Sequence, residues 1–350
     1  MTDLPTPPDL PATAPAPAAA PVPAAGPGNT ALIERVERIR EAVGQAFIGQ
    51  TDVLDQILIA LLAGGHVLIE GVPGLGKTLL VRALAQALEL DYARVQFTPD
   101  LMPSDILGTE LLEEDHGTGH RHFRFQQGPI FTNLLLADEL NRTPPKTQAA
   151  LLEAMQERTV SHAGTTRELP APFFVLATQN PIEQAGTYPL PEAQLDRFLL
   201  HVLVDYPSED EERQILEQTT GGASAAVPKV MDAEAVIALQ AAVRQVHVSP
   251  DVLAWITRLV RASRPGDGAP AAINQWVKWG AGPRAGQSLV LAAKARALLQ
   301  GRFAATREDV QALAAPVMRH RLLLSFAAEA EQKRADDVVA ALLQAVPFPG

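Results

Sequence analysis

The feature that most constrains this 350-residue chain is the stretch HVLIEGVPGLGKT at residues 66–78. Its apolar start is typical of a short buried strand, and a glycine-rich turn then leads to Lys77 and Thr78. The residues that follow have the apolar spacing of a helix. The pattern G-x-x-x-x-G-K-[ST] therefore lies in the strand–loop–helix setting that it requires, so this region must fold as a strand, a tight turn and a helix.

A loop of this kind binds phosphate because its backbone N–H groups converge on the anion. A side chain at Gly74 or Gly76 would obstruct the loop or strain its backbone. The positive end of the following helix attracts the anion further. We expect Lys77 to reach the β- and γ-phosphates and the Thr78 hydroxyl to hold Mg²⁺. The sequence thus predicts a site for ATP and Mg²⁺, with these candidate residues: Gly71, Val72, Pro73, Gly74, Leu75, Gly76, Lys77, Thr78 and Leu79.

Two acids end the apolar run IFTNLLLADE at residues 130–139, which is typical of a central parallel strand. Alone, such a pair is weak evidence, because a strand can also end in solvent-facing acids. In a chain with a phosphate loop, Asp138 is expected to bind the Mg²⁺ shell. Glu139 is then expected to orient or polarise the attacking water.

Three further positions are candidates for contact with the nucleotide. Asn180 ends a predicted strand and is placed to touch the γ-phosphate or the water, although asparagine is also a common turn former. Ile48 and Gly49 interrupt the helical pattern of residues 30–64 and either wall an adenine pocket or simply break the helix. Arg197 is either a functional cation or a surface arginine paired with Asp196 or another acid.

The overall composition limits the classes of function. The chain has 29 lysines and arginines against 40 aspartates and glutamates, a net charge of −11, which disfavours a sequence-independent nucleic-acid binder. It has no cysteine, which excludes disulfides, thiolate zinc and a cysteine nucleophile, and fits a cytoplasmic protein. We expect no membrane span and no signal peptide, because no apolar stretch is long enough and no basic leader precedes one.

The pattern divides the chain into three parts. Residues 1–29 are rich in proline and alanine and predict a disordered tail. Residues 30–207 alternate strand and helix patterns, whereas residues 208–350 have helical patterns, the last of them at 319–331. Two turn-like segments, 113–128 and 160–170, interrupt the α/β part. The first contains three histidines whose spacing matches no standard metal site, so we expect a solvated hairpin: His116, His120 and His122.

Taken together, these stretches resemble the AAA+ ATPases and, within them, the MoxR family. The resemblance runs from about residue 32 to about residue 325. It is carried by GHVLIEGVPGLGKT, RVQFTPDLMPSDILG, FRFQQGPIFTNLLLADELNR, KTQAALLEAMQE, ATQNPIEQAGTYPLPEAQLDRF and GPRAGQSLVLAAKARALLQGR. It implies a five-stranded parallel αβα core with a C-terminal helical lid, assembled into a ring, most often a hexamer.

The resemblance also implies roles that spacing alone cannot give. Lys77 and Thr78 resemble the Walker A pair, Asp138 and Glu139 the Walker B pair, and Asn180 sensor 1. Arg197 is similar to the arginine finger, which reaches a neighbour's γ-phosphate, and Arg284 to the sensor 2 arginine of the lid. The two hairpins resemble inserts that line or face the ring's pore.

Three functions compete at this stage. The family implies a chaperone-like ATPase that matures a client complex, with metal-cofactor insertion and a von Willebrand A-type partner protein as its typical setting. A nucleic-acid motor or loader is the first alternative, which the acidic charge and the few aromatic residues disfavour. A non-hydrolytic nucleotide switch that serves as an assembly scaffold is the second, and the presence of both Glu139 and Arg197 disfavours it.

Overall fold

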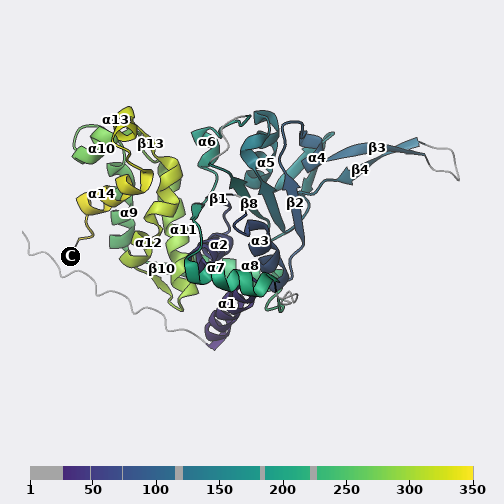
Figure 1. The fold of residues 1–350 in the computed structure, drawn as a ribbon, viewed down its shortest axis with the longest axis horizontal. Coiled ribbons are helices and arrows are strands. Elements are labelled where there is room, and N and C mark those ends of the chain that lie inside the picture. The colour runs from purple at the N-terminus through teal and green to yellow at the C-terminus, as the bar shows by residue number, and fades with distance from the viewer. Residues whose placement is uncertain are drawn as a thin grey trace, which may run out of the picture.

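A computed structural model describes residues 27–47, 49–72, 74–114, 121–181, 186–220 and 227–349. A central sheet is flanked by helices, a helical region lies on one side of it, and a long hairpin projects from the other side (Figure 1). The predicted tail at residues 1–29 lies outside the described residues, except that α1 begins at Pro27. Within the described residues, no helix combines the length and the apolarity needed to cross a membrane.

The central sheet has five parallel strands, which confirms the predicted core. Their order is β2 (Tyr92–Gln96), β5 (Leu134–Asp138), β8 (Phe174–Gln179), β1 (Val67–Gly71) and β9 (Leu200–Val204). The four strands β5, β8, β1 and β9 are largely buried, as expected for a parallel sheet covered on both faces, whereas the edge strand β2 has one buried residue, Val95. Because all five run in one direction, their carboxyl ends meet at a single edge.

Alternate residues of the strands face two separate cores. Val67 and Ile69 pack with α1 (Pro27–Ala46), α2 (Thr51–Ala63) and α3 (Lys77–Ala87). Leu68, between them, packs with α4 (Pro103–Leu107) and α5 (Pro145–Glu157) on the opposite face. This period of two produces the three layers of an αβα sandwich.

The strand predicted at residues 130–139 is shorter than its apolar run. Only Leu134–Asp138 form β5, and a turn occupies the preceding residues. The side chain of Asn133 explains the start, because it accepts a hydrogen bond from the backbone N–H of Asp91 at 3.3 Å and donates one to the carbonyl of Pro172 at 3.2 Å. These bonds fix Asn133 as the entry to the strand. A short 3-10 helix, η1 (Leu140–Arg142), follows the strand's acids.

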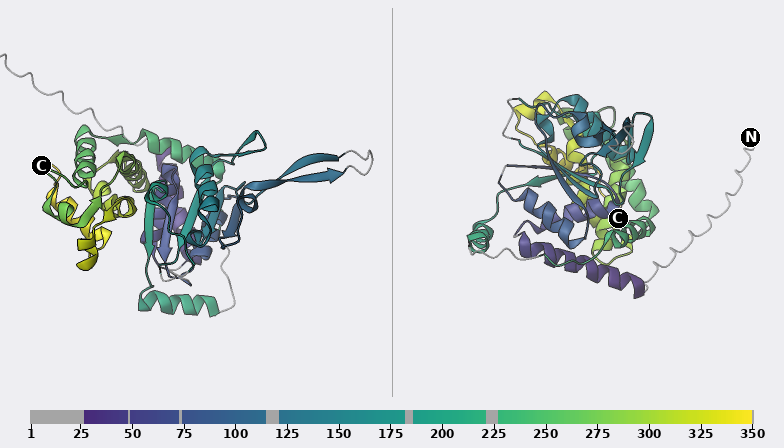
Figure 2. Two further views of the ribbon diagram at one scale, coloured as in Figure 1. Left: turned by 90° about the horizontal axis from the view of Figure 1, so that it is seen from above. Right: turned by 90° about the vertical axis from the view of Figure 1, so that its right-hand side faces the viewer.

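Both turn-like segments form antiparallel hairpins. β3 (Gly108–Glu114) pairs with β4 (Arg121–Gln127), and β6 (Thr159–His162) pairs with β7 (Thr165–Glu168). Figure 2 shows the first hairpin extending well beyond the body of the protein. His116 and His120 lie outside the described residues. No group of three potential metal ligands occurs in the part of the chain that the structure describes.

The C-terminal part is built from helices, together with two short strand pairs that the pattern did not predict. The helices are α7 (Glu209–Thr220), α8 (Ala233–Gln245), α9 (Pro250–Ala262), α10 (Ala271–Trp276), α11 (Pro283–Leu299), α12 (Arg307–Met318), α13 (Phe326–Ala330) and α14 (Ala335–Ala345). The strand pairs are β10 (His247–Val248) with β12 (Ala304–Ala305) and β11 (Val277–Trp279) with β13 (Leu323–Leu324). The predicted boundary near residue 207 stays a prediction.

The helix predicted at 319–331 is wrong. The 3-10 helix η2 (Arg319–Arg321) occupies its start, and β13 and α13 occupy the rest. Tertiary contacts override the helical pattern here. The side chains of Arg319, His320 and Arg321 bond to backbone carbonyls of residues 198–201, and the chain then pairs with β11.

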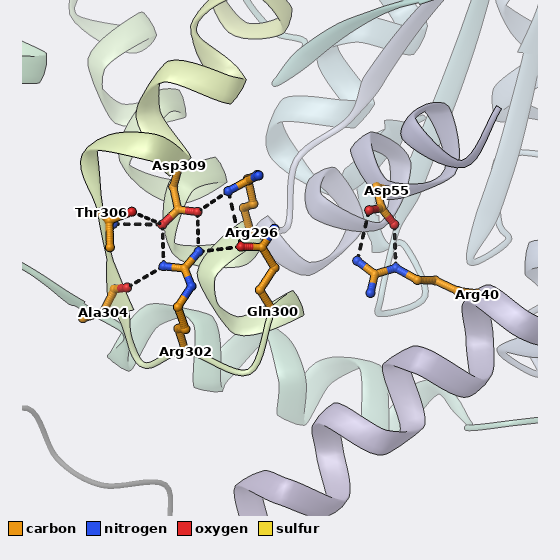
Figure 3. A network of polar contacts seen from close by, with 8 residues as sticks. All are labelled: Arg40, Asp55, Arg296, Gln300, Arg302, Ala304, Thr306 and Asp309. Carbon is orange, nitrogen blue, oxygen red and sulfur yellow. Dashed lines mark hydrogen bonds and ion pairs between the residues drawn. The ribbon is translucent and has the colours of Figure 1, made fainter.

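Inside the lid, a buried aspartate ties α11 to α12. The carboxylate of Asp309 accepts hydrogen bonds from Arg296 at 2.6 Å and from Arg302 at 2.6 and 2.8 Å (Figure 3). Asp309 also completes the N-terminal cap of α12 with Thr306. The hydrogen bonds of this cluster join residues 296–309 and so lie within the C-terminal helical part.

Candidate functional site

The phosphate loop joins the end of β1 to the start of α3. Gly74 and Gly76 have φ angles of 88° and 70°, a backbone conformation that L side chains rarely adopt. No atom lies within 4 Å of a Cβ built at Gly74, so the backbone angle, and not crowding, requires glycine there. Gly76 caps α3 without a side-chain hydrogen bond, and the first turn of α3 carries no acid. The backbone N–H groups of this turn therefore suit an anion.

Lys77 lies at the start of α3, where its ammonium group faces back across the loop. Its Nζ donates a hydrogen bond to the carbonyl of Gly71 at 2.5 Å. Burial lowers the pKa of Lys77, while the carboxylates of Asp138, Glu139 and Glu70 act in the opposite direction. The lysine thus lies within the electrostatic field of the predicted acidic pair. Pro73 lies outside the described residues.

Asp138 is the last residue of β5, and both of its carboxylate oxygens have partners. The Thr178 hydroxyl donates to Oδ1 at 2.7 Å, and Arg94 donates to Oδ2 at 2.7 Å. Asp138 at the end of β5 and Thr78 in the first turn of α3 both carry oxygen donors of the kind that Mg²⁺ prefers. The residues present therefore fit the metal that the phosphate loop implies.

Glu139 follows at once and has a left-handed backbone with a φ of 58°. Its N–H donates to the Thr178 hydroxyl at 2.8 Å. Its carboxylate oxygen Oε2 accepts hydrogen bonds from Gln96 at 2.7 Å and from Arg142 at 2.9 Å. The carboxylate is therefore held by two side chains that the sequence reasoning missed.

Asn180 is buried and directly follows β8, which lies between β5 and β1. Its strand thus separates the strand of the acidic pair from the strand of the phosphate loop. Lys77, Asp138, Glu139 and Asn180 consequently all lie at the carboxyl edge of the sheet, which we call the loop edge.

Phe47, which precedes the predicted Ile48–Gly49 segment, lies against the phosphate loop. The Phe47 ring is 3.2 Å from a Cβ built at Gly76, which places this ring beside the loop. Gln50, the residue after Gly49, donates its backbone N–H to the Glu211 carboxylate of α7 at 3.2 Å. A Cβ on Gly49 would collide with the same carboxylate. Ile48 itself lies outside the described residues.

Arg197 lies at the other end of the sheet. In the parallel register, Leu200 pairs with Val67 and Val204 with Gly71. Arg197 precedes β9, so it lies beside the start of β1, whereas Lys77 follows the end of β1. A five-residue strand is about 16 Å long. Arg197 is therefore separated from its own phosphate loop by the length of a strand.

Arg284, the second residue of α11, lies with Arg197 at this amino end, which we call the arginine edge. Both arginines line a cavity of about 210 Å³ together with Gly65 and His66, the residues just before β1. The Nε atom of Arg284 is 4.0 Å from the Asp196 carboxylate. The structure thus groups the predicted site residues at two edges and does not bring them together within one chain.

Comparison with known proteins identifies this arrangement. Residues 66–200 match the family model of the ATPase family associated with various cellular activities (AAA), and residues 270–342 match the AAA lid domain. Chaperone MoxR1 of Mycobacterium tuberculosis is 41% identical over 323 residues, which are 92% of this chain and 84% of that protein. The chain belongs to the MoxR family of AAA+ ATPases.

Two other comparisons support the same family. Protein MoxR of Paracoccus denitrificans is 34% identical over 330 residues, covering 88% of this chain and 94% of that protein. The crystal structure of a proposed ATPase from Cytophaga hutchinsonii superposes with a TM-score of 0.85 at 37% identity, over 92% of this chain and 97% of that one. The MoxR fold is therefore shared along nearly the whole chain, lid included.

In this MoxR-family chain, the side chains that hold the two acids were not among the residues predicted from the sequence: Arg94, Gln96, Arg142 and Thr178. Three of them share a feature that becomes visible once the order of the strands is known. Arg94 and Gln96 belong to the edge strand β2, and Thr178 to β8, near the carboxyl ends of the strands on either side of β5. Polar residues at such positions face the same edge as the acids. Arg142 has no comparable signal in the sequence.

Proposed function

We propose that this MoxR-family protein hydrolyses ATP at the seam between two subunits of a ring. The observation that carries the proposal is the separation of the two edges. The groups suited to bind a nucleotide lie at the loop edge, while the two candidate arginines lie a strand length away. A guanidinium at the arginine edge can serve a phosphate only if that phosphate belongs to a neighbouring subunit.

At the loop edge, Lys77 and the N–H groups of the first turn of α3 would hold the phosphates. Thr78 and Asp138 would hold Mg²⁺, which, when bound, supplies positive charge to the phosphate oxygens. Glu139 would orient the attacking water, and Asn180 would contact that water or the γ-phosphate. Arg197 and Arg284 of the neighbour would stabilise the charge that develops on the γ-phosphate.

The contacts of Glu139 support a resting arrangement. Both bonds fall on one oxygen, Oε2, which accepts from Gln96 and Arg142, so they hold the carboxylate in one orientation while it keeps acceptor sites for a water. Each such bond is worth about 1 kcal/mol, so nucleotide and neighbour contacts can change that orientation. The ring, most often a hexamer in this family, would thus set the rate of hydrolysis.

We further infer a chaperone-like task, in which ATP turnover remodels or matures a client complex. The support is membership of a family that includes a protein named Chaperone MoxR1, together with a hairpin that presents apolar side chains to solvent. Leu112 and Phe123 form a directly opposed pair on that hairpin, and 56% and 70% of their surfaces are exposed. Metal-cofactor insertion with a von Willebrand A-type partner is the specific form of this task that we propose.

Substitution of Glu139 tests the catalytic half. Glu139→Gln should bind ATP with unchanged affinity and lower phosphate release by at least about 100-fold, because the amide cannot act on the water. Lys77→Ala should lose nucleotide binding in the same assay. Turnover at the wild-type rate by Glu139→Gln would contradict the proposed role of this carboxylate.

The same Glu139→Gln variant tests the client half. A ring that holds ATP without cleaving it should retain its client, so proteins captured by Glu139→Gln, and absent from the Lys77→Ala control, are the candidate clients. Recovery of a von Willebrand A-type protein would support the proposed partner. Identical sets from both variants would contradict nucleotide-dependent client binding.

A further inference from the structure

Arg321 is a buried arginine of η2 whose bonds all converge on one short segment and the helices around it. Only 2% of its side-chain surface is exposed. Its Nε donates to the Asp196 carboxylate at 2.7 Å. Asp196 directly precedes Arg197, so this ion pair joins the lid to the loop between α6 (Glu192–Leu195) and β9.

The same guanidinium also binds the backbone on both sides of Arg197. Its Nη2 donates to the carbonyl of Phe198 at 2.6 Å, and its Nη1 donates to the carbonyl of Leu199 at 3.3 Å. A further Nη2 contact reaches the carbonyl of Asp196 at 3.3 Å. Arg321 therefore contacts three of the four backbone carbonyls of residues 196–199, and the one that it omits is that of Arg197.

Two more bonds fix Arg321 itself. Its Nη2 donates to the Ser288 hydroxyl of α11 at 3.1 Å, and its Nη1 donates to the carbonyl of Val317 on α12. His320 adds a contact between its Nε2 atom and the Phe198 carbonyl at 3.1 Å. All five N–H donors of the guanidinium thus face protein acceptors, and its planar fork sets their geometry.

Arg197 differs from Arg321 in this respect. In the described part of the chain, the half-buried guanidinium of Arg197 forms no hydrogen bond or ion pair with another side chain. Its direction therefore depends on the backbone that Arg321 holds. Asp196 also faces the second candidate arginine, because its Oδ2 lies 4.0 Å from Nε of Arg284. The carboxylate of Asp196 therefore lies between the guanidinium groups of Arg321 and Arg284, and Asp196 itself directly precedes Arg197 in the chain.

We propose that Arg321 and Asp196 are positioning residues that hold Arg197 and Arg284 as one unit, presented to the phosphate of the neighbouring subunit. This inference rests on the proposed function, in which the two arginines act between subunits. It goes further, because it assigns the alignment of both cations to a single lid arginine that touches no nucleotide. A lid that shifts on its core would then reorient both arginines together.

Mixed rings test this proposal. The recipient subunit is Arg197→Ala, which keeps its phosphate loop but supplies no finger. The donor subunit is Lys77→Ala, which supplies a finger but has no competent loop of its own. Any turnover of the mixture above that of the separate variants comes from recipient sites completed by donor fingers. The donor then carries a second substitution: Asp196→Asn, Arg321→Met or Arg302→Met.

Arg302→Met is the matched control. Arg302 is also a lid arginine bonded to a buried aspartate and a backbone carbonyl, but its partners are Asp309 and Ala304, far in sequence from residues 196–199 (Figure 3). Asp196→Asn keeps the size of the side chain and removes its charge, so it tests the same contact as Arg321→Met with less disturbance of the fold. Copurification with a tagged recipient confirms that each donor enters the ring.

The Lys77→Ala donor and its Arg302→Met form should restore turnover to within about twofold of each other, whereas the Asp196→Asn and Arg321→Met forms should restore at least about tenfold less. In an otherwise wild-type chain, Asp196→Asn should lower kcat by about the same factor and leave nucleotide affinity unchanged. Full restoration by an Asp196→Asn donor that enters the ring would overturn the positioning role alone. Absence of restoration by the plain Lys77→Ala donor would overturn the proposed seam site and this inference with it.

Discussion

The two edges of the sheet hold their charged groups in opposite ways. At the loop edge, Asp138 and Glu139 are bonded to Arg94 and Arg142, whose side chains are 46% and 41% exposed. At the arginine edge, Asp196 is bonded to Arg321, whose side chain is 2% exposed and fully hydrogen-bonded. The first set of contacts lies near water, where ion pairs contribute little and exchange readily. The second set is buried and fixed.

This difference matches the tasks proposed for the two edges. Acids that must turn toward a metal ion or a water are best held by exposed arginines, because such ion pairs exchange readily. A cation that must meet a phosphate on another chain gains from being aligned beforehand, because alignment then costs nothing at the moment of reaction. In the resting structure, the side chains of the loop edge can therefore change partners, whereas those of the arginine edge are already aligned.

The largest expected effect is a difference in turnover between variants of the arginines at the two edges. Arg197→Ala should lower turnover by about 1,000-fold or more, since a finger contributes this much in phosphoryl transfer, while nucleotide affinity stays within about twofold. Arg94→Ala should change turnover by less than about tenfold, because Thr178 still holds Asp138. Phosphate release at saturating ATP measures both. Equal losses in the two variants would remove the distinction between the edges.

The next effect concerns stability. Arg321→Met leaves Asp196 and several carbonyls without their buried donor and should lower the free energy of unfolding by about 3 kcal/mol. Arg94→Met removes an exposed partner and should cost less than about 1 kcal/mol. Denaturant titration of the two purified variants gives both values. A cost for Arg94→Met as large as that for Arg321→Met would show that the contacts of the loop edge are also fixed.

A pH dependence should sharpen the comparison at the arginine edge. Burial lowers the pKa of His66 from 6.5 to about 4, and its ring accepts from the N–H of Val175 and donates to the carbonyl of Met155. The folded protein thus holds His66 neutral, whereas the unfolded chain takes up a proton below pH 6.5. The contribution of His66 to the free energy of unfolding is therefore fully present above pH 6.5. It falls by about 3 kcal/mol as the pH drops from 6.5 toward 4.

His66→Gln should flatten part of that slope, because glutamine does not titrate. The remaining slope includes a contribution from His320, whose pKa burial also lowers well below its usual value, and from carboxyl groups with lowered pKa values, such as Glu70. Thermal or denaturant unfolding between pH 7 and pH 4 measures the change, with the wild-type chain as the reference. A slope identical in both proteins would contradict a neutral, locked His66.

The smallest effect tests the loop edge. Gln96→Ala removes one of the two side chains that hold the Glu139 carboxylate. The free energy needed to turn this carboxylate away from its resting position should fall by about 1 kcal/mol, the worth of one hydrogen bond. Turnover without a client should rise by up to about tenfold, because the carboxylate, then held only by Arg142, turns more easily toward the attacking water. A fall in turnover would instead indicate that Gln96 helps to orient Glu139 for the reaction.

The loop edge was largely predictable from the sequence, since each of its main residues follows a recognisable strand. Lys77 and the acidic pair have the required residue types at the required places, and the parallel sheet brings them to one edge. Their supporting side chains were not predictable from spacing, because Arg94 and Gln96 come from a strand whose place in the sheet only the fold reveals. Arg142 reaches Glu139 from η1, a turn that the pattern did not show.

The arginine edge was predictable only as separate residues. Arg197 and Arg284 stand out by family resemblance. Nothing in their spacing shows that Nε of Arg284 lies 4.0 Å from the carboxylate of Asp196, the residue before Arg197. Arg321 lay inside a predicted helix, and its side chain would have been assigned to a helix surface. Instead, the carbonyls of residues 196–199 attract it, and local periodicity cannot anticipate partners 122 to 125 residues away.

The hairpin of β3 and β4 has a mechanical consequence. Near its base, the ring of Phe125 lies 3.9 Å from the guanidinium carbon of Arg167 and 5.5 Å from the His162 ring, both on the second hairpin. The second hairpin directly follows α5, which begins three residues after Arg142. The strand from Phe125 to its described end at Arg121 is about 14 Å long, so a tilt of about 10° at Phe125 would sweep that end through about 2 Å. The first hairpin is thus a lever whose short end rests on the second hairpin.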